Sequence, residues 1–99
     1  MARSIEFSIR FTKQLQNILD FYDNRNGTDT YSKYLLKCLM NDIALISEMP
    51  MASFSSTRKD VRFIYLLGFT VIFRYNSTKV TMLSIRYSSR KPLTLYERD

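Results

Sequence analysis

Histidine is absent from this sequence of 99 residues. Histidine is the usual general base, a common metal ligand and the usual pH switch near neutrality. Its absence excludes a Ser-His-Asp triad and a Cys/His metal set. Any proton transfer must therefore involve tyrosine, lysine, a carboxylate or the substrate itself. We expect no metal and no other cofactor.

Cysteine, glycine and long apolar runs are also scarce. Cys38 is the single cysteine, so no intramolecular disulfide can form, which fits a reducing cytoplasm. Two glycines, Gly27 and Gly68, cannot supply a phosphate-binding glycine loop. No stretch approaches the roughly 20 apolar residues of a membrane span, and charges interrupt the N-terminal apolar positions, unlike in a signal peptide. We therefore expect a cytoplasmic protein with one domain, residues 1–99, and no membrane partner.

The net charge of +6 is unevenly distributed. Residues 1–50 hold six basic and six acidic residues, whereas residues 51–99 hold nine basic and three acidic ones. All the excess positive charge therefore lies in the C-terminal half. This asymmetry suggests an anionic partner, either nucleic acid or an acidic protein segment. A solubilising surface is the alternative interpretation.

Apolar side chains recur at helical spacing in two segments on either side of Gly27. We expect the first helix to be capped by Ser8 or Thr12 and to end near Asp23. Its apolar face comprises Phe11, Leu15, Ile18, Leu19 and Tyr22. The second helix should end at Pro50, and its apolar face comprises Tyr31, Tyr34, Leu35, Cys38, Leu39, Ile43 and Ile46. The short break predicts an antiparallel helical hairpin.

The rest of the chain alternates between β-prone blocks and turns. Residues 4–8 predict a short N-terminal strand, and residues 61–67, 69–75 and 80–87 predict three more. The connections between the last three are too short for parallel crossovers, so an antiparallel meander is expected. The predicted fold class is α+β, with an N-terminal strand and the hairpin packed on the meander. We expect residues 51–60 to form an irregular, mobile connection, and the tail after residue 87 to begin irregularly.

Arginine and tyrosine side chains lie near the ends of the predicted strands. A guanidinium binds phosphate through two parallel hydrogen bonds. It could stabilise the phosphorane formed when a 2′-hydroxyl attacks RNA, and a tyrosine with a lowered pKa could move the proton. The candidate catalytic residues are Arg62, Arg86, Arg90, Tyr87 and Tyr96. The candidate nucleic-acid-binding residues are Arg58, Lys59, Arg62, Arg74, Arg86, Arg90 and Lys91. Each arginine could instead be a solvated charge on a strand.

The order of these elements and their residues resemble the RelE/ParE toxins of bacterial type II toxin–antitoxin systems. The most specific part is segment 61–75, VRFIYLLGFTVIFRY, which is similar to the family's basic strand, Gly-aromatic turn and aliphatic-aromatic strand. Met49-Pro50 and residues 85–92 also fit, so the resemblance covers nearly the whole chain. It implies a growth-inhibiting toxin and an acidic antitoxin that folds on binding.

The resemblance leaves the target open. RelE-like members cleave mRNA on the ribosome without a metal, and ParE-like members poison DNA gyrase. In RelE-like sequences a cleavage arginine follows the Gly-aromatic turn, where this chain has Thr70. The second arginine falls near Ser88, with Arg86 and Arg90 close by, and the C-terminal tyrosine could correspond to Tyr96. The open alternatives are therefore an mRNA endonuclease, a gyrase poison and a non-toxic nucleic-acid or protein binding module.

Overall fold

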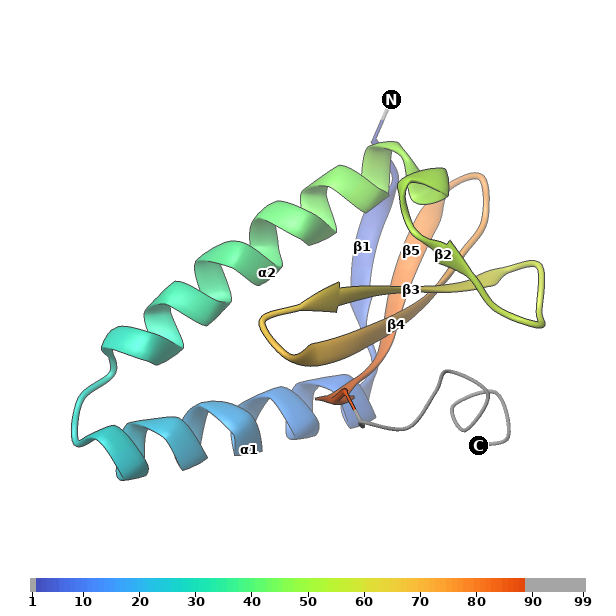
Figure 1. Cartoon of the computed structure of the whole chain (residues 1–99). Helices are drawn as coiled ribbons and strands as arrows, with labels where there is room; N and C mark the ends of the chain where they lie inside the picture. The colour runs from blue at the N-terminus through green and yellow to red at the C-terminus, as the bar shows by residue number, and fades with distance from the viewer. Residues whose placement is uncertain (1, 89–99) are drawn as a thin grey trace.

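The structure, a computed structural model, describes residues 2–88 as two helices packed on a five-stranded sheet (Figure 1). The elements follow one another as β1 (Ser4–Phe7), α1 (Ile9–Asn26), α2 (Thr30–Glu48), a 3-10 turn (Pro50–Ala52), β2 (Phe54–Ser55), β3 (Val61–Leu66), β4 (Phe69–Tyr75) and β5 (Lys79–Tyr87). The strand order is β1-β5-β4-β3-β2. The predicted α+β class and the antiparallel β3–β4–β5 meander are confirmed.

The ends of α1 are determined by two small residues. The Ser8 Oγ accepts a hydrogen bond from the Phe11 amide at 3.0 Å, as expected of an N-cap. At the other end Gly27 has φ +70°, and its N–H donates to the Asp23 carbonyl at 2.9 Å. The helix runs to Asn26 and so exceeds the predicted end at Asp23, because Gly27 is the first residue with left-handed backbone.

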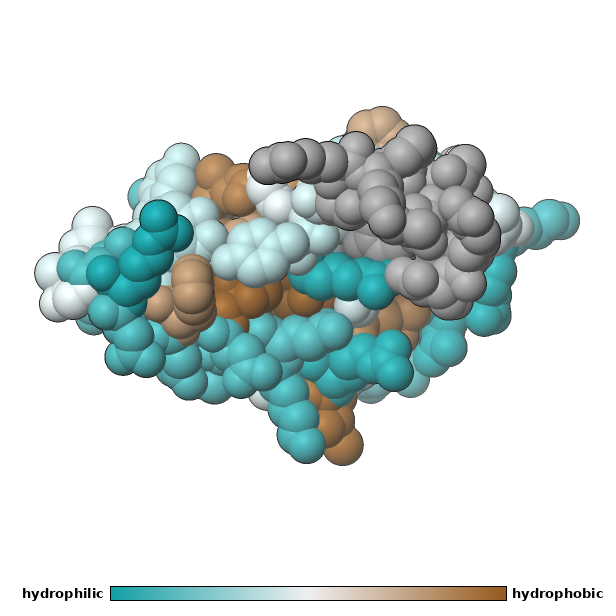
Figure 2. Space-filling view, turned by 60° about the horizontal axis from the view of Figure 1, so that its bottom comes forward, coloured by the Kyte–Doolittle hydropathy of each residue, from teal (hydrophilic) through white to brown (hydrophobic). Residues whose placement is uncertain are grey.

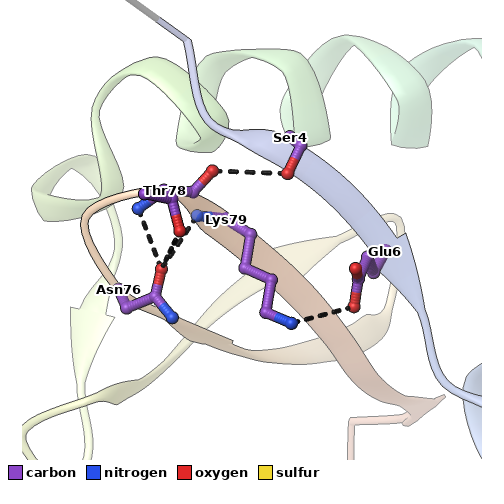
Figure 3. Close-up of polar contacts among 5 residues, drawn as sticks. All are labelled: Ser4, Glu6, Asn76, Thr78 and Lys79. Atoms are coloured by element: carbon purple, nitrogen blue, oxygen red, sulfur yellow. Dashed lines mark hydrogen bonds and ion pairs between the residues drawn. The ribbon is translucent and has the colours of Figure 1, made fainter.

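β1 pairs in parallel with β5, at the edge of the sheet away from β2. Figure 3 shows how the two strands are joined at their start. The Ser4 Oγ donates to the Thr78 carbonyl at 3.3 Å, and the Lys79 ammonium lies 3.4 Å from a Glu6 carboxylate oxygen. The Asn76 Oδ1 accepts from the Thr78 and Lys79 amides and so closes the β4–β5 turn. The contacts of Ser4 and Glu6 join β1 to the start of β5.

The connection at residues 51–60 contains regular structure, contrary to the prediction of an irregular segment. Residues Pro50–Ala52 form a 3-10 turn, and β2 then pairs antiparallel with β3. Phe54 lies opposite Phe63, and Ser55 lies opposite Arg62. A strand of two residues is too short to produce a periodic pattern, so the sequence did not predict this edge of the sheet.

Both helices cover the same face of the sheet (Figure 1). The core between them contains Phe11, Ile18, Leu35, Leu39, Ile43, Ile46, Ile64, Phe69, Val71, Phe73, Val80, Met82 and Ile85. Tyr34 is a correction, because its helical position predicted an inner side chain and it is 52% exposed. Among residues 2–88, neither helix is long and apolar enough to cross a bilayer.

Candidate basic and aromatic face

The sheet has a second face, opposite the helices, which we call the outer face. Side chains alternate along β4, so Val71 and Phe73 face the core while Thr70, Ile72 and Arg74 face outward. Directly paired residues point to the same side. The pairing of Tyr65 with Thr70, and of Thr70 with Arg86, therefore places Tyr65 and Arg86 on the outer face too.

Thr70 is fully buried on this face and is hydrogen-bonded to Ser88. The two hydroxyl oxygens lie 2.8 Å apart, and the Ser88 N–H donates to the Gly68 carbonyl at 2.8 Å. The family resemblance places its two cleavage arginines at or near these positions. In this chain the two positions hold neutral hydroxyls that bind each other.

Arg62 lies on the helix side of the sheet, because it pairs with the core residue Phe73. Its Nε donates to the Ser53 Oγ at 2.8 Å, and its Nη2 donates to the Ser53 carbonyl at 2.5 Å. Arg86 lies two strands away and faces outward. The structure therefore does not bring Arg62 and Arg86 together, and it gives Arg62 a partner in the segment that joins α2 to β2.

Tyr87, at the end of β5, points back towards the helices. Its hydroxyl donates to the Tyr22 hydroxyl at 3.0 Å, and its ring centroid lies 4.7 Å from that of Phe69. The hydrogen bond to Tyr22, with a smaller effect of burial, raises the pKa of Tyr87 to about 12. A proton acceptor would need a lowered pKa, so the shift is opposite to the one expected of a catalytic tyrosine.

A recess of about 350 Å³ opens beside Arg74 near the β4–β5 turn. Its other lining residues are Asp60, Tyr75, Asn76, Lys79 and Thr81. The Lys79 ammonium is paired with Glu6, whereas Arg74 is exposed and forms no ion pair within the described part of the chain. The guanidinium of Arg74 is therefore the cation at this recess best able to bind an anion.

Three aromatic rings lie together on the outer face at the β2–β3 edge. The Phe54 ring is 5.5 Å from the rings of both Phe63 and Tyr65, and the last two are 5.6 Å apart. Phe54 is 54% exposed and Tyr65 is 45% exposed, whereas Phe63 is buried. Sequence reasoning missed Phe54 because it missed β2, whose two residues carry no periodic pattern.

The remaining candidate site residues lie either in the β2–β3 loop or after residue 88. Arg58 and Lys59 lie in the loop between β2 and β3, where Arg58 is 3.5 Å from Asp60 in an exposed ion pair. Arg90, Lys91 and Tyr96 lie outside the described residues. Residues 2–88 contain no group of three or more side chains suited to hold a metal ion.

The helical side of the molecule exposes apolar side chains as well as hydrophilic ones. Most residues on the exposed side of α1 are hydrophilic, although Ile9 and Phe21 are also exposed, and hydrophobic residues are visible between this helix and the sheet (Figure 2). Along α2, several large apolar side chains are also exposed: Tyr34, Met40, Leu45 and Met49. Exposed apolar side chains of this kind are typical of a surface that a protein partner covers.

The fold is shared with chains of two toxin–antitoxin systems. One belongs to the chromosomal ParDE system from P. aeruginosa, with a TM-score of 0.71 and 15% identity over 89% of this chain and 98% of that one. The other belongs to the RelBE2 toxin–antitoxin complex from Mycobacterium tuberculosis, with a TM-score of 0.59 and 10% identity over 89% of this chain and 100% of that one. No protein-family model and no curated protein matches the sequence. The expected RelE/ParE-like fold is confirmed.

Proposed function

We propose that this chain, which has the RelE/ParE-like fold, is the toxin of a bacterial type II toxin–antitoxin system and acts in the cytoplasm. The observation that carries the proposal is the fold it shares with chains of the ParDE and RelBE2 systems over nearly their whole length. The sequence resemblance in segment 61–75 supports the same assignment independently.

The toxin acts by binding its target, as ParE-like members do with DNA gyrase. The Thr70–Ser88 hydroxyl pair supports this mechanism, because Thr70 stands where the resemblance to cleaving relatives expects an arginine, and the second expected arginine falls near Ser88. Neutral hydroxyls cannot offset the charge of a phosphorane as guanidinium groups do. The hydrogen bond to Tyr22 raises the pKa of Tyr87, so its phenol is harder to deprotonate than a free tyrosine and is less suited to accept a proton.

Cleavage of mRNA on the ribosome is the second candidate. The excess of basic residues in the C-terminal half favours it, because a polyanion such as ribosomal RNA attracts such a surface. In this mechanism Arg86 and Arg90 would bind phosphate, with Tyr87 or Tyr96 near the reacting hydroxyl. It would need no metal. Arg62 could take part only after leaving Ser53, to which it is hydrogen-bonded.

The partner that neutralises the toxin is an acidic antitoxin. Acidic residues would complement the basic outer face, and apolar residues would cover the exposed side chains of α2, such as Leu45 and Met49. The two groups lie on opposite sides of the sheet, so an antitoxin that folds as it wraps around the domain would bury both.

Induced expression with and without the adjacent reading frame tests the proposal. We expect growth arrest from this chain alone and recovery when a neighbouring acidic protein is co-expressed. During the growth arrest, cleaved gyrase–DNA complexes should accumulate while mRNA stays intact. Ribosome toeprints with new mRNA ends would instead support the nuclease. Normal growth at high expression would contradict both, and would favour a non-toxic binding module.

A further inference from the structure

We propose that Phe54 and Tyr65 form a stacking platform for unpaired bases of a single-stranded nucleic acid. The proposal goes beyond toxicity and does not depend on which target the toxin has. It concerns the aromatic rings at the edge of the outer face where β2 joins β3, to which the proposed function assigns no role.

The geometry of the aromatic cluster suits stacking. Phe54 and Phe63 are nearly parallel, with an interplanar angle of 23° and centroids 5.5 Å apart. Phe63 is 8% exposed and so forms a fixed floor, while Phe54 keeps more than half of its surface exposed. Tyr65 adds a second exposed ring 5.5 Å from Phe54. Two exposed rings on a rigid support are the arrangement on which successive bases stack.

Basic residues lie on the loop and strands next to these rings. Arg58 and Lys59 belong to the loop that joins the two strands carrying the cluster. Arg74 lies two residues beyond Ile72, the partner of Phe63 across the ladder, and faces the same side. Arg86 lies on the same ladder position as Tyr65, two strands away. Asp60 is the one acidic residue of the β2–β3 loop, and its pair with Arg58 is exposed.

The charges favour nucleic acid over a purely apolar peptide as the occupant. An exposed salt bridge contributes little free energy, so Arg58 can leave Asp60 to bind a phosphate. Arg74, which forms no ion pair within residues 2–88, adds a second phosphate contact beside its recess. Exposed ring faces with basic residues on the same face and on the adjoining loop suit a flexible strand, whereas bases in a duplex are already stacked on each other.

Fluorescence anisotropy of the purified full-length chain with labelled dodecamers of uridine or thymidine tests the platform. A duplex of the same length serves as the comparison, and binding is measured at low and moderate salt. We expect Phe54→Ala to weaken single-strand binding by about 5- to 140-fold, the range found when a stacking ring is removed. Tyr34→Ala is the matched control, because Tyr34 is an aromatic residue of similar exposure on α2.

Two further variants separate stacking from packing. Phe54→Tyr keeps the aromatic face and should keep the affinity, whereas Phe54→Leu keeps an apolar side chain and should lose it. Thermal unfolding of each variant checks that the fold is retained. The platform is overturned if the duplex binds as tightly as the single strand, or if Phe54→Leu binds like the unsubstituted chain. It is also overturned if Phe54→Ala releases a protein partner and leaves oligonucleotide binding unchanged.

Discussion

The hydroxyl of Thr70 lies 2.8 Å from the hydroxyl of Ser88, and this contact links β4 to the residue that follows β5. Thr70 is fully buried, so the pair is shielded from water on the Thr70 side. A buried hydroxyl needs a hydrogen-bond partner, and Ser88 supplies one. The same contact fixes where the chain leaves the sheet, because Ser88 also donates its N–H to Gly68.

Replacing Thr70 by valine tests what this contact contributes. Valine keeps the shape and removes the hydroxyl, which leaves the Ser88 hydroxyl without this partner. We expect Thr70→Val to lower the free energy of unfolding by about 1 kcal/mol. In a domain of this size, that loss lowers the thermal midpoint by about 4 to 8 °C.

Thr81→Val is the matched control for that measurement. Thr81 lies on the outer face of β5, is half-buried, and its hydroxyl forms no hydrogen bond within the described part of the chain. Its replacement should therefore change the midpoint little. Equal effects of the two substitutions would mean that the Thr70–Ser88 contact adds no stability.

Local sequence patterns predicted most helices and strands of this fold. They did not predict features that depend on pairing between distant segments or on very short strands. The helical faces of α1 and α2 and the alternation in β4 were readable, because each repeats over several residues. β2 was missed because its two residues carry no period. The parallel pairing of β1 with β5 joins residues more than 70 positions apart, and no local pattern encodes such a partner.

In the candidate site, too, local features were predicted and contacts between distant segments were not. The sequence predicted that basic residues lie on the strands of the meander, because this requires only the strand boundaries and no knowledge of side-chain contacts. It did not predict that Arg62 would face the helices and bind Ser53, because that contact depends on the path of the segment after α2. Nor did it predict the hydrogen bond that raises the pKa of Tyr87, since Tyr22 lies on a different element.

Arg62 should stabilise the connection between α2 and β2. Its guanidinium makes two hydrogen bonds to Ser53, and a lysine ammonium cannot reproduce their forked geometry. We expect Arg62→Lys to speed amide hydrogen exchange in residues 50–56 and to lower the free energy of unfolding by about 1.5 to 3 kcal/mol. Hydrogen–deuterium exchange with mass spectrometry measures the local effect.

Arg74→Lys is the control for Arg62, because Arg74 is exposed and has no hydrogen-bond partner among residues 2–88. Its substitution should leave exchange in residues 50–56 unchanged. If Arg62 instead binds the cellular target, Arg62→Lys would abolish growth arrest while hydrogen exchange stayed as in the unsubstituted chain. That outcome would contradict a stabilising role.

The pKa of Tyr87 predicts a dependence of stability on alkaline pH. The folded state raises this pKa from 10 to about 12, so it favours the protonated phenol. The resulting stabilisation is fully present below pH 10 and is lost as the pH rises to about 12. Removing the hydroxyl of Tyr22 with Tyr22→Phe should return the pKa of Tyr87 towards 10 and reduce this loss.

Ultraviolet titration of tyrosinate absorbance, with unfolding measured in parallel, follows both effects. Tyr34→Phe is a suitable control, because Tyr34 lies on the exposed side of α2 and forms no contact with Tyr87. Growth inhibition should not change between pH 6 and 9 through Tyr87, which stays protonated there. A Tyr87 titration that is identical in the unsubstituted and Tyr22→Phe chains would contradict the hydrogen bond as the cause.

Substitutions at two neighbouring positions of the β3–β4 turn should change the thermal midpoint in opposite directions. Leu67 and Gly68 both have positive φ, at 49° and 84°, a conformation that costs a leucine about 1 to 2 kcal/mol and a glycine almost nothing. Leu67→Asn should therefore raise the thermal midpoint, because asparagine tolerates this backbone and Leu67 is 40% exposed. Gly68→Ala should lower it, although no atom lies within 4 Å of the added Cβ, because the cost is in the backbone itself. Differential scanning calorimetry measures both, and a lower midpoint for Leu67→Asn would show that packing of the leucine side chain outweighs its backbone strain.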